Sequence, residues 1–362
     1  MSTVSVQATP DYSAEALDRA VAAHFEALHA AQFLTPATRV LLKPNLLAAR
    51  DPSLAVTTHP ALLLAVARYL HAQGVQKITL ADSPGGLYTA PALRKLYAAC
   101  GLLELEKLVT LNEDTSFFER GGFTLIQPIA QADFIINCAK LKTHGLTVMT
   151  AGVKNLFGCI PGLRKPELHC IKPTIDSFSE MLLKLSQAVA PTLTLLDAVD
   201  CMEGNGPSGG SIRRMGVTLA SCDIYALDEQ AALLMGLRPI AVPTVRLSRT
   251  LGLLSAETAL VGDPLTPAAP PFVLPDSVTK GEKLFTPNGL FHRLCGRKTT
   301  FPCVITASCI GCGRCAESCP KHIIQIVKRK AVIGRKGCIS CFCCQEMCPA
   351  HAITVQTGRR SR

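Results

Sequence analysis

Short apolar runs alternate, over the first two thirds of the chain, with longer segments whose apolar residues recur every three or four positions. The four strongest runs predict buried strands at residues 39–45, 77–81, 133–138 and 192–199. Helical periodicity predicts helices at residues 12–31, 59–74, 90–101, 147–159 and 174–189. A fifth strand at 217–220 precedes a helix at 224–235. This alternation predicts an α/β fold with a mainly parallel, doubly wound sheet.

The pattern changes after residue 266, where prolines become frequent. The segment PAAPPFVLPD begins at Pro267, and a cysteine-rich region follows it from Cys303. Proline-rich stretches of this kind are typical of linkers. We therefore predict an α/β domain, a linker, a small α+β module and a frayed tail, over residues 1–266, 267–302, 303–357 and 358–362.

The cysteine-rich module contains one motif twice. CIGCGRCAESCPKHII occupies residues 309–324, and CISCFCCQEMCPAHAI at 338–353 repeats its cysteines, proline and histidine. Each copy has the C-x2-C-x2-C-x3-C-P spacing of bacterial ferredoxins with two clusters. A zinc site or a disulfide framework is the alternative, but two tandem runs of four cysteines favour two [4Fe–4S] clusters.

The ferredoxin spacing also predicts which cysteines bind which cluster. The first three cysteines of a run bind one cluster, whereas the fourth binds the other cluster. The first cluster is therefore assigned to Cys309, Cys312, Cys315 and Cys348. The second cluster is assigned to Cys338, Cys341, Cys344 and Cys319. Cys343 lies inside the second run but does not fit the ligand spacing.

Positive charge is concentrated in this module. The chain has a formal net charge of +10, and from Cys303 onward ten basic residues accompany only two acidic ones, Glu317 and Glu346. We expect the basic groups at 328–330, 335–336 and 359–360 to bind an acidic electron carrier, a ferredoxin or flavodoxin. A solvated basic surface is the alternative. We expect no nucleic-acid binding, because aromatic residues are sparse and tryptophan is absent.

Cysteine usage and hydropathy predict the cellular compartment. The 362-residue chain has 17 cysteines, and cluster motifs need free thiolates, which favours a reducing compartment. No run of about 18 apolar residues predicts a membrane span. The first residues, MSTVSVQATP, lack the basic and apolar regions of a signal peptide. We therefore expect a cytoplasmic protein.

Each of the four strong strands runs into a polar or glycine-rich segment. These segments are KPN (43–45), DSPGG (82–86), KLKTH (140–144) and MEGNGPSGG (202–210). Ligands of open α/β sheets bind beyond the carboxyl ends of the strands. We therefore expect the four segments to converge on one rim, although each alone is also compatible with an ordinary turn.

The KLKTH segment points to an anion site at this rim. Alternate residues of a strand share a face, and buried lysines need an anion or lose their charge. We expect a small anion, a carboxylate or a phosphate, to bind among Lys43, Asn45, Asp82, Ser83, Lys140, Lys142, Lys154, Asn155 and His169. The candidates for proton transfer are His144 and Glu203.

Two other interpretations of the rim remain open. The basic group could be a solvated surface without a ligand. Alternatively, a metal could bind His144, His169, Asp82 and Glu203. No HxxE or HxxxH spacing supports a metal site. Cys159 and Cys170 flank the basic segment, and the sequence assigns no role to them.

The rim segments together resemble the iron–sulfur protein family called domain of unknown function 362. The most specific part is INCAKLKTHGLTVMTAGVKNLFGCIPG at residues 136–162, and KPNLL, DSPGG and MEGNGPSGG agree with it. The resemblance covers residues 40–237 and the ferredoxin tail. It implies an α/β domain with electron-transfer clusters, mainly from anaerobic bacteria and archaea, and it implies no reaction. The basic tail departs from the commonly acidic ferredoxin tails.

The leading hypothesis is a redox enzyme. A soluble carrier would deliver electrons to the clusters, which would pass them to an anionic substrate at the rim. The first alternative is a non-catalytic electron-transfer protein whose α/β domain docks a partner enzyme. The second is a non-redox enzyme in which the clusters are structural or regulatory.

Overall fold

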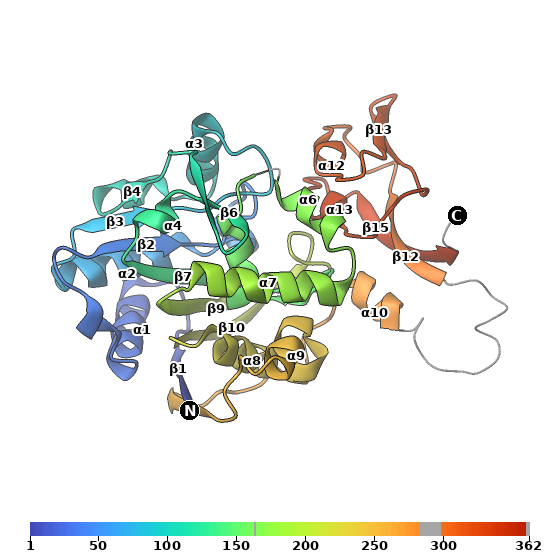
Figure 1. The fold of residues 1–362 in the computed structure, drawn as a ribbon. Coiled ribbons are helices and arrows are strands. Elements are labelled where there is room, and N and C mark those ends of the chain that lie inside the picture. The colour runs from blue at the N-terminus through green and yellow to red at the C-terminus, as the bar shows by residue number, and fades with distance from the viewer. Residues whose placement is uncertain (163, 283–297, 360–362) are drawn as a thin grey trace.

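The computed structural model describes residues 1–162, 164–282 and 298–359. Within them, one sheet of nine strands has the order β11-β1-β10-β9-β7-β2-β3-β4, and β8 pairs with β7. Helices cover both faces of this sheet, and the C-terminal module lies beside one of its ends (Figure 1). The chain is thus an α/β domain followed by a small module, as the sequence predicts.

The four predicted strands are neighbours at the centre of the sheet. They are β2 (Arg39–Lys43), β3 (Lys77–Leu80), β7 (Phe134–His144) and β9 (Leu193–Glu203). β3 and β7 flank β2, β9 lies beside β7, and all of these pairs are parallel. Their carboxyl ends therefore meet at one edge of the sheet, as predicted.

The remaining strands make the sheet mixed. β10 (Ser211–Ser221) is antiparallel to both β9 and β1 (Ser2–Ala8), so the MEGNGPSGG segment is a hairpin loop. The others in the sheet are β4 (Thr110–Leu111), β8 (Val148–Thr150) and β11 (Thr258–Gly262). A separate hairpin joins β5 (Phe117–Arg120) to β6 (Phe123–Ile126), and the short α4 (Pro128–Gln131) follows it.

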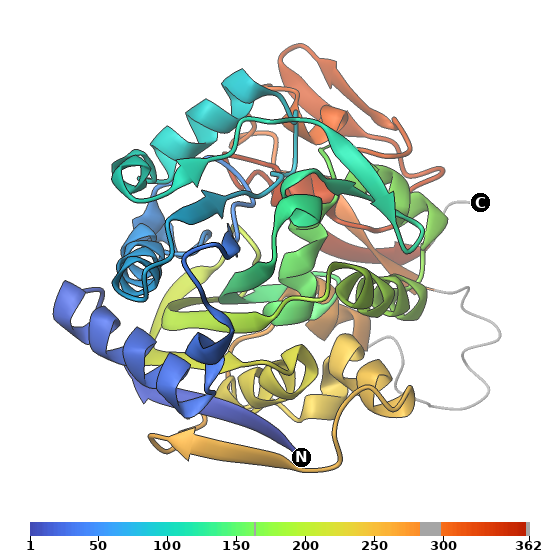
Figure 2. The ribbon, with the colours of Figure 1, turned by 60° about the vertical axis from the view of Figure 1, so that its left-hand side comes forward.

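Alternating side chains of β2 explain why helices cover both faces. Val40 and Leu42 pack on one face, whereas Leu41 packs on the other. The first face is covered by α1 (Ala14–Ala27), α2 (Pro60–Ala72) and α3 (Ala90–Ala99). The second is covered by α7 (Ile175–Val189), α8 (Ile224–Leu234) and α9 (Pro243–Thr250). The rotated view in Figure 2 shows both layers of helices.

The helix predicted at 147–159 is not continuous. The segment forms β8, then α5 (Gly152–Asn155) and a 3-10 turn (Leu156–Cys159). Val148 has a φ of 67°, which cannot belong to a right-handed helix. Asp228 accepts hydrogen bonds from the amides of Gly152 (2.6 Å) and Val153 (3.1 Å), which fixes where α5 begins. As a result, Lys154 and Asn155 lie at the strand ends.

The proline-rich stretch is not a free linker at its start. Phe272 is buried in the core that also contains Leu219 of β10. The amide of Gly204 donates a hydrogen bond to the Val273 carbonyl (2.6 Å). α10 (Asp276–Glu282) follows, and residues 283–297 of the predicted linker lie outside the described residues. The first part of this stretch therefore belongs to the α/β domain.

The C-terminal module begins before the predicted residue 303. β12 (Lys298–Val304) pairs with β15 (Ile353–Arg359), and β13 (Ile324–Val327) pairs with β14 (Lys330–Ile333). Its short helices are α12 (Arg314–Glu317) and α13 (Cys343–Glu346). Residues 358 and 359 of the predicted tail belong to β15, and 360–362 lie outside the described residues.

The module packs against the edge where the parallel strands end. Ser208 Oγ donates a hydrogen bond to the Glu346 carbonyl (2.7 Å), and Lys280 Nζ donates to the Val355 carbonyl (2.9 Å). Cys170 of α6 (Arg164–Ile171) lies against the Pro320 carbonyl. None of the helices within the described ranges is both long and apolar enough to cross a membrane.

We predict that Phe272→Ala lowers the free energy of unfolding by about 3–5 kcal/mol, because it leaves a cavity in the core. Val273→Ala is the matched control, since this neighbouring side chain is 60% exposed. The control should change stability by less than about 0.5 kcal/mol. Anaerobic urea unfolding measures both. An effect of Phe272→Ala as small as that of the control would show that Phe272 is not part of the α/β core.

Candidate functional site

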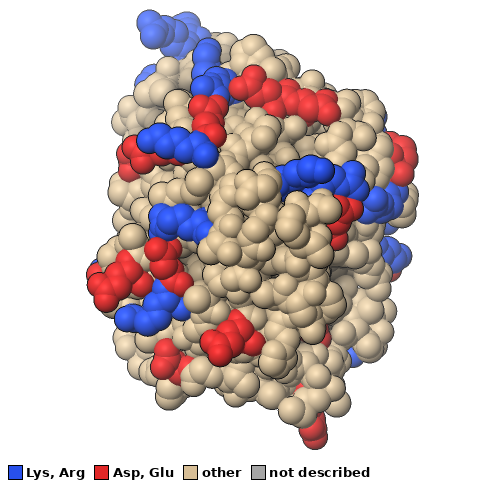
Figure 3. Space-filling view, turned by 90° about the vertical axis from the view of Figure 1, so that its left-hand side faces the viewer, with Lys and Arg blue, Asp and Glu red and all other residues tan. Residues whose placement is uncertain are grey.

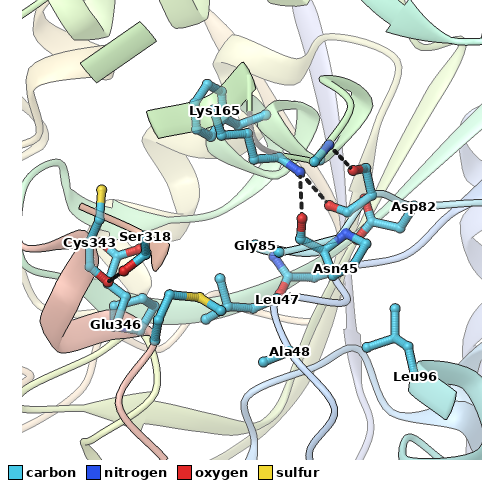
Figure 4. A pocket seen from close by; sticks show the side chains of 18 of the residues that line it. Asn45, Leu47, Ala48, Asp82, Gly85, Leu96, Lys165, Ser318, Cys343 and Glu346 are labelled. Carbon is cyan, nitrogen blue, oxygen red and sulfur yellow. Dashed lines mark hydrogen bonds between the residues drawn. The ribbon is translucent and has the colours of Figure 1, made fainter. Parts of the chain in front are cut away.

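A cavity of about 760 Å³ lies between the strand-end edge and the C-terminal module. On the side of the α/β domain its wall includes Lys142 and Lys154, and on the module side it includes Cys312 and Cys343. Figure 4 shows Asn45 and Asp82 approaching from one side, and Cys343 and Glu346 from the other. We call this space the interdomain cavity, because both parts of the chain enclose it.

The structure brings most of the predicted site residues to this cavity. Eight of the eleven line it: Asn45, Asp82, Ser83, Lys142, His144, Lys154, Asn155 and His169. The other three, Lys43, Lys140 and Glu203, have different surroundings. The predicted convergence of the strand ends thus accounts for the cavity, although it does not account for every side chain.

Lys43 lies beneath the cavity in a buried ion pair. Its Nζ donates to Asp82 Oδ1 (2.7 Å) and to the Pro44 carbonyl (2.7 Å), and the Leu46 amide donates to Asp82 Oδ2 (2.6 Å). A Cβ added at Gly158 would lie only 2.0 Å from Asp82 Oδ1, so the 3-10 turn passes directly over the pair. Lys43 therefore positions Asp82 and does not contact a ligand.

Lys140 does not join Lys142 and His144. Its Nζ donates to Asp197 Oδ2 (3.0 Å) and Tyr12 Oη (2.8 Å), and the ring of Tyr12 stacks on His59. Asp197 is the partner of Lys140 in the register of β7 and β9, and this register shifts before Lys142. The ion pair with Asp197 therefore holds the ammonium group of Lys140 away from the cavity.

Glu203 does not line the cavity either. Its Oε2 accepts hydrogen bonds from Arg213 Nη1 (3.0 Å) and from the Val273 amide (3.0 Å). These contacts hold residues 271–273 against the end of β9. Glu203 is thus placed to secure this segment, and it is not placed for proton transfer in the cavity.

Two buried lysines in the cavity wall keep hydrogen-bonding capacity for a ligand. Lys142 Nζ donates to Asn45 Oδ1 (2.9 Å) and to the Val56 carbonyl. Lys165 Nζ donates to the carbonyls of Ser83 (2.6 Å) and Pro84 (3.0 Å). An ammonium group has three N–H donors, so one remains on each lysine. Burial lowers the pKa of both lysines to about 7.

His144 directs a hydrogen-bond donor toward Glu346 in the cavity wall. Its Nδ1 accepts hydrogen bonds from the amides of Leu146 (3.1 Å) and Thr147 (3.3 Å), so Nε2 carries the hydrogen. Nε2 lies 3.2 Å from Glu346 Oε1. Burial lowers the pKa of His144, which keeps its ring neutral. A neutral ring protonated at Nε2 is not a base on that side, contrary to the role that the sequence suggested.

The carboxylate of Glu346 is ionised within this group. Burial opposes its ionisation, but His144 and Lys154 outweigh burial and lower the pKa of its carboxyl group. Within the described chain, neither Glu346 Oε1 nor His144 Nε2 has a hydrogen-bond partner of good geometry. Both atoms are buried, so they face each other and not the open cavity.

Lys154 and His169 surround an aromatic part of the wall. Lys154 Nζ lies 4.8 Å from the centroid of the Phe157 ring, and His169 stacks on Phe178 with a centroid separation of 4.3 Å. Burial lowers the pKa of His169 to about 3, so the ring is neutral. Burial lowers the pKa of Lys154. No hydrogen-bond acceptor for Lys154 Nζ occurs among the described residues, so this group is open to an anion.

The DSPGG loop is not a phosphate cradle. The amide of Ser83 donates to the Gly158 carbonyl (2.9 Å), and the amide of Gly85 donates to the Leu47 carbonyl (3.0 Å). Ser83 Oγ accepts a hydrogen bond from the Gly162 amide (2.8 Å). Because the chain itself uses these groups, anion binding rests on lysine side chains rather than on backbone N–H groups.

Sequence reasoning missed several polar residues of the wall, which are Lys95, Thr150, Lys165, Arg314, Glu317, Ser318 and Glu346. Nothing in the sequence RKPE at residues 164–167 distinguishes a buried Lys165 from a solvated lysine. Glu346 lies inside a cysteine run, where the ligand spacing was the visible signal. Both line the cavity only because the module packs on the strand ends.

The cysteines assigned to the first cluster, Cys309, Cys312, Cys315 and Cys348, line a second, smaller cavity. The amide of Ala331 donates to Cys309 Sγ (3.3 Å), and that of Ala352 donates to Cys348 Sγ (3.2 Å). Such hydrogen bonds favour thiolates. The donor set therefore fits a [4Fe–4S] cluster, which needs four thiolates.

The second set of cysteines is also close together. Burial, and then the nearby Cys341, Cys338 and Cys319, raise the pKa of Cys344. These three are the partners that the spacing assigns to it. Four neighbouring thiols fit a second [4Fe–4S] cluster in the same way.

The remaining cysteines near the site have packing positions. Cys159 is buried in the core under the 3-10 turn, and burial raises the pKa of its thiol to about 12. Cys170 Sγ lies 3.5 Å from the Pro320 carbonyl. Cys343 is buried and contributes to the interdomain cavity.

The structure does not support a separate metal site at the rim. Among residues 1–162, 164–282 and 298–359, no group of three or more His, Cys, Asp and Glu side chains is placed to hold a single metal ion. Asp82 is bound to Lys43, and Glu203 is bound to Arg213. Only His144 and His169 of the four candidates keep free donor atoms at the cavity.

Comparison with known proteins identifies the family. The model described as "Domain of unknown function (DUF362)" matches residues 40–233. The chain belongs to the DUF362 family. A second model, described as a 4Fe-4S dicluster domain, matches residues 308–353. This DUF362 chain therefore binds two [4Fe–4S] clusters in its C-terminal module, as the cysteine spacing predicts.

One curated relative is the thylakoid-associated protein sll1697 of Synechocystis. It is 36% identical over 232 residues, which cover 61% of this chain and 70% of the relative. Among solved structures, a Thermotoga maritima protein matches with 12% identity and a TM-score of 0.36, covering 54% of this chain and 53% of its own. The lactate racemase apoprotein of Thermoanaerobacterium thermosaccharolyticum matches with 11% identity and a TM-score of 0.38, covering 62% and 57%. This chain spans little more than half the length of each solved structure.

We predict that Cys344→Ser and Cys343→Ser differ in iron content. Anaerobically purified wild-type protein should contain about eight iron atoms per chain, and Cys344→Ser should contain about four. Cys343→Ser should keep about eight, because this buried thiol is not a predicted ligand. Colorimetric iron and sulfide assays measure both variants. Loss of iron from Cys343→Ser alone would overturn the ligand assignment.

Proposed function

We propose that this DUF362 chain is an oxidoreductase that transfers electrons between its two clusters and an organic anion in the interdomain cavity. One observation supports this most strongly. Cys312 is a predicted cluster ligand, and Cys343 lies in the chain between the predicted ligands Cys341 and Cys344. Cys312 and Cys343 line the same cavity as Lys142 and Lys154. When bound, the clusters supply one-electron transfer. A molecule in this cavity would therefore lie next to the electron conduit.

The cations of the cavity favour a carboxylate. Lys154 has a free ammonium group over an aromatic ring, and Lys142 and Lys165 each keep one N–H donor. Charge-assisted hydrogen bonds to a carboxylate are about twice as strong as neutral ones. Glu346 offsets part of the positive charge, so the site suits a small anion rather than a polyphosphate.

Apolar side chains also line the cavity, which supports an organic substrate. They are those of Leu47, Ala48, Leu87, Leu96 and Met347. Ligand sites commonly combine an apolar wall with a few polar groups that fix orientation. We infer a substrate whose carboxylate faces Lys154 and whose apolar body lies along this wall.

Lys142 and Lys165 are the groups best suited to exchange protons near neutral pH. Burial lowers the pKa of Lys142, Lys154 and Lys140 lower it further, and Glu346 and Asp82 oppose them. Burial also lowers the pKa of Lys165, aided by Lys43 and Lys154 and opposed by Asp82 and Cys159. A bound anion favours the charged form and would raise both pKa values. Substrate binding would then bring protons into the cavity.

A cytoplasmic location fits this function, because cluster cysteines need a reducing compartment. The relative from Synechocystis is described as thylakoid-associated, which makes attachment to the surface of a membrane the alternative location. The non-catalytic alternative predicts that the isolated protein binds no small organic anion. Carboxylate binding therefore separates it from the proposed enzyme.

We predict that hexanoate and benzoate bind the holoprotein, and that Lys154→Met weakens this binding about ten- to a hundredfold. The substitution removes the free cation but retains an apolar side chain beside Phe157. Anaerobic isothermal titration calorimetry measures the dissociation constants. Lys107→Met, at the exposed end of a distant turn, is the control and should bind as the wild type does. No carboxylate binding by the wild type would argue against the proposed function.

We also predict proton uptake when a carboxylate binds at about pH 8. Both lysines have a folded pKa of about 7, below the ordinary lysine value of 10.5, so they are mostly neutral at this pH. The bound anion raises their pKa, and protons enter from the buffer. At about pH 5.5 both are already charged, and uptake should vanish. Calorimetry in buffers of different ionisation enthalpy measures this difference.

The same shifts set the sign of the pH dependence of stability. Between about pH 10.5 and 7 the unfolded chain binds more protons than the folded one, so stability falls as the pH is lowered through this range. A double variant, Lys142→Met with Lys165→Met, should lose both this dependence and the proton uptake. Equal heats in all buffers at pH 8 would contradict the proton-exchange role.

A further inference from the structure

Two exposed apolar side chains lie at the cavity assigned to the first cluster. Ile310 and Ile326 line that cavity, yet they are 59% and 39% exposed. Cys312, between them and the interdomain cavity, is also exposed. Apolar side chains this open beside a redox centre are typical of a contact surface. We call Ile310, Ile326, Lys328, Arg329 and Lys330 the outer patch.

The basic residues of the outer patch are held against the cysteine loop. Lys328 and Arg329 form the turn between β13 and β14, with φ values of 48° and 59°. A Cβ added at Gly311 would lie 2.3 Å from the Arg329 carbonyl oxygen, so this turn packs closely on the loop. Lys330 Nζ donates to the Cys309 carbonyl (2.7 Å). The turn that carries these cations thus lies directly against the cysteine loop of the first cluster.

No acidic residue of the module compensates the outer patch. From Cys303 onward the sequence has only Glu317 and Glu346 as acidic residues, and both line the interdomain cavity. The charge distribution is different on the face of the α/β domain that is turned away from the module. On that face, basic and acidic side chains lie next to one another (Figure 3). The outer patch therefore presents uncompensated positive charge around an apolar centre.

We propose that the outer patch is the docking site of an acidic one-electron carrier protein. Charge complementarity selects the partner, and Ile310 and Ile326 supply the desolvated centre of the contact. Cys312 lines both the first-cluster cavity and the interdomain cavity. Carrier and substrate would thus approach the cluster from different sides. This goes beyond the proposed function, since it does not depend on what the cavity binds.

A flavodoxin in its hydroquinone state is a suitable probe. Its anionic flavin hydroquinone would lose one electron and become the neutral semiquinone, and that electron would reduce one cluster. Calorimetry with oxidised flavodoxin measures the dissociation constant at low ionic strength. Stopped-flow bleaching of the cluster absorbance measures the rate with the hydroquinone. Both experiments use the full-length holoprotein.

Two double variants with the same change in net charge test the site. Lys328→Glu with Arg329→Glu reverses charge in the outer patch, whereas Lys107→Glu with Arg238→Glu reverses exposed charges on the α/β domain. The first should weaken binding and slow the bleaching by about tenfold or more, and added salt should remove this difference. The second should change either value by less than about twofold. Iron content should stay at about eight atoms in both variants.

Three results would overturn the docking site. The first is an equal effect of the two double variants on the dissociation constant and on the bleaching rate. The second is no flavodoxin binding by the wild type at low ionic strength. The third is an outer-patch variant that binds flavodoxin as the wild type does but no longer sediments with phosphatidylglycerol vesicles. The last would identify the patch as a membrane-binding surface. Hexanoate binding should be unaffected by the patch variant, so failure of this inference is distinguishable from failure of the proposed function.

Discussion

The buried ion pair between Lys43 and Asp82 is the constraint on which the cavity depends. Both side chains are almost fully buried, and removing one partner of such a pair typically costs about 3–5 kcal/mol. Asn155 Oδ1 accepts a hydrogen bond from Asn45 (2.9 Å), and Asn45 Oδ1 accepts one from Lys142. This network joins the ends of β2, β3 and β7, so Lys142 reaches the cavity in a fixed position.

The C-terminal module and the strand ends of the α/β domain contribute different groups to the interdomain cavity. The α/β domain supplies cations, neutral imidazoles and an apolar wall, but it supplies no redox centre. The module supplies cysteines and the carboxylate of Glu346, which faces His144 Nε2 at 3.2 Å. These two atoms are buried and lie against each other where the two parts of the chain meet. Packing of the two parts and formation of the site are therefore one event.

Sequence reasoning succeeded where the signal was local. The apolar runs located the four parallel strands, and the repeated cysteines identified the cluster module. Sequence reasoning failed where a residue that is distant in the sequence determines where a side chain lies. Asp197, on the neighbouring strand, draws Lys140 away, and Arg213 holds Glu203 outside the cavity. The prolines after residue 266 suggested a linker, but the burial of Phe272 depends on contacts with β10 that no local pattern reveals.

The charges of the module have opposite arrangements on its two sides. Its two carboxylates face the interdomain cavity, where they meet Lys142, Lys154 and the imidazole of His144. Of its cations, Arg314 also lines that cavity, whereas Lys328, Arg329 and Lys330 belong to the outer patch. The proposed acidic carrier would be attracted to the outer patch, and the proposed carboxylate would bind on the inner side near Lys154. The two proposed partners would then bind on different sides of the module.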